Sequence, residues 1–192
     1  MCSNFIRWCI ALTAIAFCSV ADAHPGHGFD VMAGISHPFL GLDHLLAMVA
    51  VGVWASQLGG RAMWLVPASF VALMALAGSV GMGGIALPVV ESGIATSVLL
   101  LGLLIAFAVK VRPALAAVIV ASFAVFHGYA HGAEMPVLGT PWQYGFGFIL
   151  STAVLHGLGL LLGGSLRNQG LGLRAAGVLV AASGACMMAA TG

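Results

Sequence analysis

The chain has 192 residues, of which 61% are hydrophobic and only 6% are charged, and its mean hydropathy is +1.13. Soluble domains carry roughly 25% charged residues, so this composition excludes a water-soluble fold and predicts an integral membrane protein. The formal net charge of +1, with no cluster of basic residues, excludes a nucleic-acid partner.

Residues 1–23 have the three-part pattern of a secretory signal peptide. Arg7 supplies the basic start, residues 8–20 form the apolar core, and residues 21–23 are a small-x-small cleavage motif. The alternative is that the segment remains attached as a first transmembrane helix.

Cleavage after Ala23 would leave residues 24–192 as a single transmembrane domain. The new N-terminus would carry a free amine beside His24 and His27, which is either a metal-capturing tip or a polar tail. Cys186 would be the only cysteine left, so neither an intramolecular disulfide nor a site built from several thiolates is expected.

Six apolar stretches follow, each close to the ~20 residues that a helix needs to cross the hydrocarbon core of a bilayer. Glycine, proline and charged residues separate them. The sequence therefore predicts an all-α, polytopic membrane protein, a bundle of six transmembrane helices. The predicted spans are about 36–57, 62–82, 91–109, 113–132, 142–163 and 173–190.

The positive charges predict the orientation of this bundle. With the mature N-terminus outside, every basic residue of the mature chain falls in or beside an inside loop, as the positive-inside rule requires. These residues are Arg61, Lys110, Arg112, Arg167 and Arg174. We therefore expect a multi-pass membrane protein whose mature N-terminus lies outside.

The first predicted span contains an acid and a base side by side, Asp43 and His44, with His37 seven residues upstream. On a continuous helix the two histidines share one face, and Asp43 points about 100° away from His44. Because Pro38 disfavours helical geometry at the preceding residue, we expect His37 at the outer mouth of the helix. Asp43 would either bind a metal ion itself or orient a histidine ligand.

The fourth predicted span ends with His127, His131 and Glu134, which share one face of a helix at i, i+4 and i+7. Two imidazoles and a carboxylate in this register suit a divalent metal ion. Ionisable groups within a membrane helix are also functional candidates by default. The alternative is an imidazole pair that is hydrogen-bonded to neighbouring helices.

Two other groups are candidates for the path of an ion. Glu91 opens the third predicted span at the outer level. His156 lies about 20 Å into the fifth span, so it is either a relay below the outer site or a structural core histidine. Imidazole and carboxylate donors without thiolate favour nickel, cobalt or zinc over calcium or magnesium.

Two motifs in this order resemble the signatures of the HupE/UreJ family of nickel permeases. They are His37-Pro38-x-x-Gly41-x-Asp43-His44-x-x-x-Met48 and Phe126-His127-Gly128-x-Ala130-His131-Gly132-x-Glu134. The resemblance extends over the mature chain and implies import of nickel or cobalt for hydrogenase or urease. It also implies a location in the bacterial inner membrane, with the mature N-terminus in the periplasm. The important positions that it implies are His37, Asp43, His44, Glu91, His131 and Glu134.

The chain contains no Walker-type nucleotide loop, so we expect a secondary permease without ATP hydrolysis. We expect no enzymatic activity and no permanently bound cofactor. The expected partners are Ni²⁺ or Co²⁺ as cargo, the lipid bilayer, and hydrogenase or urease maturation proteins. The rival interpretations are an intramembrane metal-dependent enzyme, which would lack a His-Glu-x-x-His motif here, and a metal sensor or assembly partner that does not transport.

The residues that we expect to bind or conduct the metal ion fall into two groups. The predicted metal ligands are His37, Asp43, His44, His127, His131 and Glu134. The predicted capture or path residues are His24, His27, Glu91 and His156.

Overall fold

The structure, a computed structural model, describes residues 31–135, 140–166 and 169–191. The expected signal peptide and the tip with His24 and His27 lie outside these residues. The described chain is all α-helical with short connections, which confirms the predicted class. Its helices are α2 (Val31–Leu40), α3 (Leu42–Leu58), α4 (Ala62–Met82), α5 (Val90–Ala106), α6 (Pro113–Ala133), α7 (Pro141–Ser165) and α8 (Gly170–Thr191).

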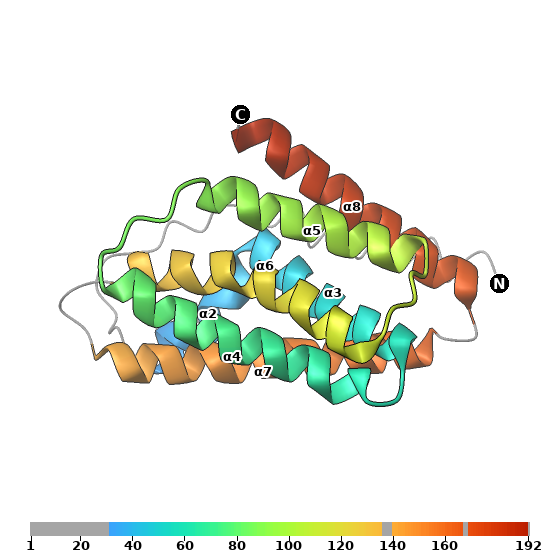
Figure 1. The fold of residues 1–192 in the computed structure, drawn as a ribbon, viewed down its shortest axis with the longest axis horizontal. Helices are drawn as coiled ribbons and strands as arrows, with labels where there is room; N and C mark the ends of the chain where they lie inside the picture. Colours follow the sequence, from blue (N-terminus) through green and yellow to red (C-terminus); the bar gives the residue numbers. More distant parts are fainter. Residues whose placement is uncertain (1–30, 136–139, 167–168, 192) are drawn as a thin grey trace.

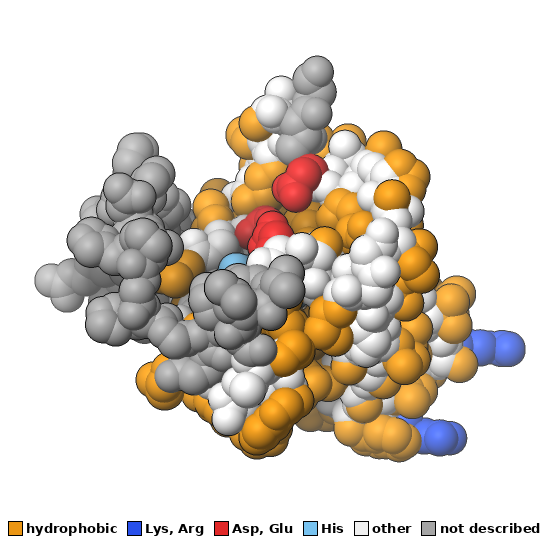
Figure 2. Space-filling view, turned by 90° about the vertical axis from the view of Figure 1, so that its left-hand side faces the viewer, with side chains coloured by type: hydrophobic (Ala, Val, Ile, Leu, Met, Phe, Trp, Pro, Cys, Tyr) orange, Lys and Arg blue, Asp and Glu red, His pale blue; other side chains and the backbone are white. Residues whose placement is uncertain are grey.

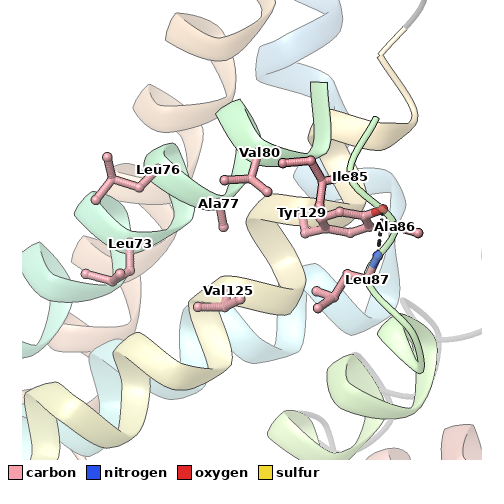
Figure 3. Close-up of a pocket in the computed structure, with 9 residues that line it drawn as sticks. All are labelled: Leu73, Leu76, Ala77, Val80, Ile85, Ala86, Leu87, Val125 and Tyr129. Carbon is pink, nitrogen blue, oxygen red and sulfur yellow. Dashed lines mark hydrogen bonds between the residues drawn. The ribbon is translucent and has the colours of Figure 1, made fainter. Parts of the chain in front are cut away.

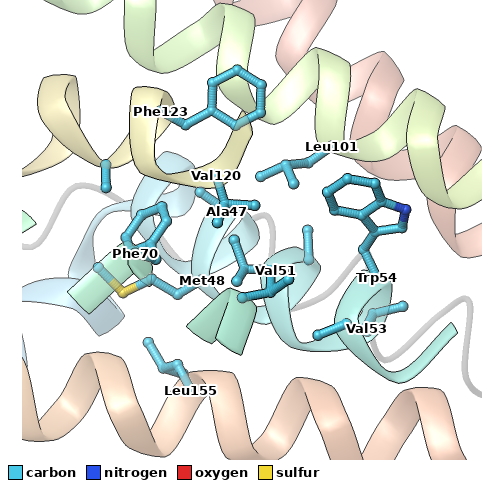
Figure 4. Close-up of a cluster of buried hydrophobic side chains, with 14 of the residues drawn as sticks. Ala47, Met48, Val51, Val53, Trp54, Phe70, Leu101, Val120, Phe123 and Leu155 are labelled. Atoms are coloured by element: carbon cyan, nitrogen blue, oxygen red, sulfur yellow. The ribbon is translucent and has the colours of Figure 1, made fainter. Parts of the chain in front are cut away.

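Helix α3 lies at the centre of the bundle and contacts every other described helix. It is apolar around its whole circumference, as expected for a helix buried on all sides. Figure 1 shows α5 and α8 along one edge of the bundle and α4 and α7 along the opposite edge. Figure 4 shows the core that α3 forms with its neighbours, which includes Met48, Val51, Trp54, Phe70, Leu101, Val120 and Leu155.

Four helices are long and apolar enough to cross a membrane, as in a multi-pass membrane protein: Ala62–Met82, Pro113–Ala133, Pro141–Ser165 and Gly170–Ala190. They coincide closely with the predicted second, fourth, fifth and sixth spans. The predicted third span, 91–109, is shorter in the structure. Helix α5 has 17 residues and ends at Ala106, just before Ala108 adopts a left-handed conformation with φ of 50°.

The predicted first span, 36–57, is wrong as a single straight helix. It is divided into α2 and α3, which meet at an angle of 86°. Gly41 between them is extended, with φ of −91° and ψ of 116°. A Cβ atom at Gly41 would lie 2.8 Å from Asp43 Oδ1, so a side chain there would displace the Asp43 carboxylate from its present position.

The predicted position of His37 at the mouth of the helix is also wrong, because α2 begins at Val31 and continues through His37 and Pro38. Proline has no N–H, so it leaves the carbonyl of Gly34 without its usual helical partner. The Ser151 hydroxyl on α7 lies 3.5 Å from this carbonyl. Packing of α2 against α7 therefore provides a polar neighbour at the point where the proline weakens the helix.

The bundle separates its charges. The three described carboxylates, Asp43, Glu91 and Glu134, lie at the ends of α3, α5 and α6 that meet on one side. Figure 2 shows acidic side chains on this face beside a small patch of histidine surface. The described basic residues lie at the opposite helix ends, where Lys110 Nζ donates a hydrogen bond to the carbonyl of Gln57.

Helices α4 and α6 pack closely enough to require glycine at the contact. A Cβ atom at Gly128 would lie only 2.1 Å from the carbonyl oxygen of Met74. We expect Gly128→Ala to lower the free energy of unfolding by about 1–3 kcal/mol, the usual range for overpacking. Thermal unfolding in detergent measures this effect. Gly145→Ala is the matched control, because a Cβ atom there meets nothing within 4 Å, and equal losses in both variants would contradict the prediction.

Candidate metal site

Four histidines from α2, α3 and α6 converge at the acidic end of the bundle. The ring centroid of His131 lies 4.3 Å from that of His44 and 4.5 Å from that of His37. His127 lies one helical turn before His131 on α6, and its ring centroid is 4.9 Å from that of His44. The structure thus brings the two sequence motifs together around His131.

The group closest to a metal-binding arrangement is formed by His37, His131 and Glu134. One candidate ligand atom from each of them lies within 4.8 Å of the other two. Glu134 is exposed, His37 is half-buried and His131 is buried. The group therefore leads from the surface of the acidic end into the bundle.

The ring of His44 is oriented by the carboxylate beside it. Asp43 Oδ1 lies 2.8 Å from His44 Nδ1 and also accepts a hydrogen bond from the His44 backbone N–H. An ionised carboxylate can only accept, so Nδ1 carries the ring proton. In the neutral imidazole this tautomer leaves His44 Nε2 with its lone pair, and Nε2 has no hydrogen-bond partner among the described residues. Asp43 Oδ1 therefore fixes the His44 ring in an orientation in which Nε2 can accept a metal ion.

The ring of His127 is oriented by Ser97 on α5, which sequence reasoning missed. The Ser97 hydroxyl donates to the carbonyl of Ile94 at 2.7 Å and lies 2.8 Å from His127 Nε2. A hydroxyl has one proton, so Ser97 must accept from His127 Nε2–H. His127 Nδ1 is left unprotonated and without a partner within the described chain. No sequence spacing links α5 to α6, so only the packing of the two helices identifies this pair.

His131 differs from its two neighbours, because neither of its ring nitrogens has a hydrogen-bond partner among the residues described. The Phe148 ring of α7 packs against it, with centroids 3.9 Å apart, and His37 lies 6.0 Å from the ring of Tyr144. These aromatic side chains form an apolar wall beside the imidazoles. Such a wall lowers the local dielectric and strengthens the attraction between a cation and its ligands.

Glu134 follows the last residue of α6 and lies outside the helical span. Burial raises the pKa of the Glu134 carboxyl; the His44 imidazole opposes this shift, and the carboxylates of Glu91 and Asp43 reinforce it. Asp43 and Glu91 also line one cavity of 260 Å³ between α3, α5 and α8. Glu91 thus joins the acidic end of the bundle without joining the imidazole cluster itself.

His156 lies apart from this cluster, buried on α7. The Phe70 ring of α4 lies between the two regions, 5.7 Å from His127 and 5.2 Å from His156. Of the predicted site residues, the structure therefore groups His37, Asp43, His44, His127, His131 and Glu134. It places Glu91 beside them and His156 on the far side of an aromatic ring.

A second cavity, of 280 Å³, lies between α4, α6 and the connection before α5. Figure 3 shows that its lining is apolar except for Tyr129, whose hydroxyl accepts a hydrogen bond from the Leu87 N–H at 3.1 Å. The lining includes no carboxylate or imidazole. This cavity therefore has no ligands for a hard or borderline metal ion.

The Ser97 hydrogen bond can be tested by Ser97→Ala. We expect nickel affinity to fall by ~10–100-fold, the usual cost of losing a partner that orients a histidine ligand. Calorimetric titration of the purified protein measures this loss. Ser122→Ala is the matched control, because its hydroxyl also donates to the carbonyl three residues earlier but has no histidine partner in the described structure. Unchanged affinity in Ser97→Ala would refute the orienting role.

Known proteins match this chain over almost its full length. The family model described as HupE / UreJ protein matches residues 11–187. The chain is 50% identical over 181 residues to Protein HupE of Rhizobium leguminosarum bv. viciae, which covers 92% of this chain and 94% of that protein. No solved structure matches the chain significantly.

Proposed function

The chain belongs to the HupE/UreJ family, and from this premise we propose that it is a secondary permease that imports Ni²⁺, or Co²⁺, across the bacterial inner membrane. The observation that carries the proposal is the convergence of His37, His44, His127 and His131 with Glu134 at one end of an apolar bundle. Ionisable groups at membrane depth are costly, and in transporters they mark the path of an ion.

The donor chemistry supports a borderline divalent cargo. His44 and His127 each offer one unprotonated nitrogen, and Glu134 supplies negative charge near His131. Within the described chain, Cys186 is the only cysteine and is exposed on α8, so no thiolate joins the site. Imidazole and carboxylate ligands of this kind suit nickel, cobalt or zinc.

The proposed path begins at the acidic end. A hydrated cation would be attracted by Glu91 and Glu134, lose water as it binds His37 and His131, and pass to His44. The carboxylates offset its charge in a setting of low dielectric. No ATP-binding loop occurs in the sequence, so the gradient, the membrane potential or a partner would supply the driving force.

We also propose the orientation of the chain in the membrane and its six membrane crossings. The bent pair α2–α3 would form one crossing, and α5 would form another despite its length of 17 residues. The signal peptide would be removed from the mature protein. Separation of the acidic and basic helix ends supports a periplasmic site and cytoplasmic basic loops. The imported metal would supply maturation of a hydrogenase or a urease.

Uptake of radioactive nickel into liposomes that contain the purified protein tests the proposal. We expect uptake that cobalt inhibits, with no turnover of any added substrate. A permease, unlike an enzyme or a sensor, is required for accumulation inside a closed vesicle. Equal nickel content in protein-containing and empty liposomes would refute transport.

A further inference from the structure

His156 is a buried imidazole that lacks partners. Its side chain is only 2% exposed, and neither ring nitrogen has a hydrogen-bond partner among the described residues. Buried polar groups are normally satisfied, because leaving one unpaired costs free energy. An ion that passes this point would satisfy the ring when it binds.

The surroundings of His156 supply further donor atoms. Thr152 lies one helical turn before it on α7, and Phe70 lies one turn before Met74 on α4. The Thr152 hydroxyl lies 3.4 Å from Met48 Sδ and 3.8 Å from Met74 Sδ. All five side chains are buried. An imidazole, a hydroxyl and two thioethers thus gather where α3, α4 and α7 meet.

Phe70 adjoins both this region and the outer cluster. Its ring centroid lies 5.7 Å from that of His127 and 5.2 Å from that of His156, and the side chain is fully buried. Figure 4 shows Phe70 and Met48 within the buried core beside α3. The helices themselves have little freedom here, because a Cβ atom at Gly52 would lie 2.2 Å from the carbonyl oxygen of His156. Passage of an ion from the outer cluster to His156 would therefore depend on rotation of the Phe70 side chain.

We propose that His156, with the thioethers of Met48 and Met74, forms an inner station for the transported divalent cation, and that Phe70 is the gate between this station and the outer imidazole cluster. The proposal deepens the proposed function and rests on it. None of the described carboxylates is among the side chains of the station, so the station carries no negative charge. It therefore holds a cation more weakly than the outer cluster does, as conduction through successive sites requires.

Replacement of His156 by leucine tests the station, because leucine fills the volume without offering a ligand atom. We expect nickel uptake into liposomes to fall by at least ~10-fold, while nickel affinity in detergent, set by the outer cluster, stays near the wild-type value. Leu155→Ala is the control: Leu155 is the adjacent residue, 1% exposed, and the loss of its side chain should leave uptake near wild type. Wild-type uptake in His156→Leu, or an affinity loss as large as the uptake loss, would overturn the station.

A second measurement does not depend on transport. At Co²⁺ concentrations high enough to fill a weaker site, equilibrium dialysis of the wild type should find one bound ion more than dialysis of His156→Leu. Phe70→Ala should keep this additional ion, because it alters the gate and leaves the ligands of the station in place. If the wild type fails to transport nickel, the proposed function fails, yet the additional ion would still support the station. Its absence overturns the station whether or not transport occurs.

Discussion

His131→Ala is expected to abolish nickel uptake and to weaken nickel binding by more than ~100-fold, beyond the range seen when only an orienting partner is lost. His131 is the centre of the cluster, with ring centroids 4.5 Å from His37 and 4.3 Å from His44. Its removal eliminates a ligand and separates the two motifs that meet there. Calorimetry in detergent and uptake into liposomes measure the two effects.

Val120→Ala is the control for this prediction, because Val120 is also fully buried on α6 but lies two helical turns before His127. It should lose some stability and keep its affinity for nickel. If His131→Ala binds nickel as tightly as Val120→Ala does, the cluster is not the binding site.

Glu134→Gln is expected to have the second largest effect, because it removes the negative charge and keeps the shape of the side chain. Glu134 supplies the carboxylate of the group that it forms with His37 and His131, so we expect its loss to weaken nickel binding by at least the ~10–100-fold that loss of an orienting partner costs. Uptake at nanomolar nickel should therefore be lost, while the protein still reaches the membrane.

The same variant should alter the pH dependence of binding. A metal ion binds the deprotonated carboxylate, so affinity falls as the pH falls and the carboxyl becomes protonated. Because burial raises the pKa of Glu134, this loss begins at a higher pH than for an ordinary glutamate. A plot of log affinity against pH should be shallower in Glu134→Gln than in the wild type. Identical slopes would show that Glu134 does not bind the ion.

Much of the helical framework follows from the sequence, because hydrophobic length and helix-breaking residues are local properties. The predicted spans at 62–82 and 113–132 agree with α4 and α6 within a residue at each end. The shared face of His127 and His131 also follows from the helical repeat alone, and both rings contact His44 in the structure. The accumulation of acids at one end follows from alternating helix direction.

Contacts between helices were not predictable in the same way. Pro38 was expected to place His37 at the mouth of the helix. In the structure α2 continues through both residues, and a neighbour on α7 lies beside the carbonyl that the proline leaves unpaired. Ser97 is one of several serines in apolar helices, and nothing local distinguishes it from Ser122. Its role depends on the approach of α5 to α6, which places its hydroxyl 2.8 Å from His127.

The sequence by itself determined that this is an all-helical membrane protein with imidazoles and carboxylates at one end, because periodicity and composition act within each segment. Only the tertiary structure decided how these groups meet. The 86° bend at Gly41 docks α2 on α7, so the rings of His37 and His44 are 6.3 Å apart, whereas seven residues of straight helix would separate them by about 10 Å along the axis. That bend depends on packing between residues distant in the chain, and it brings His37 beside His131.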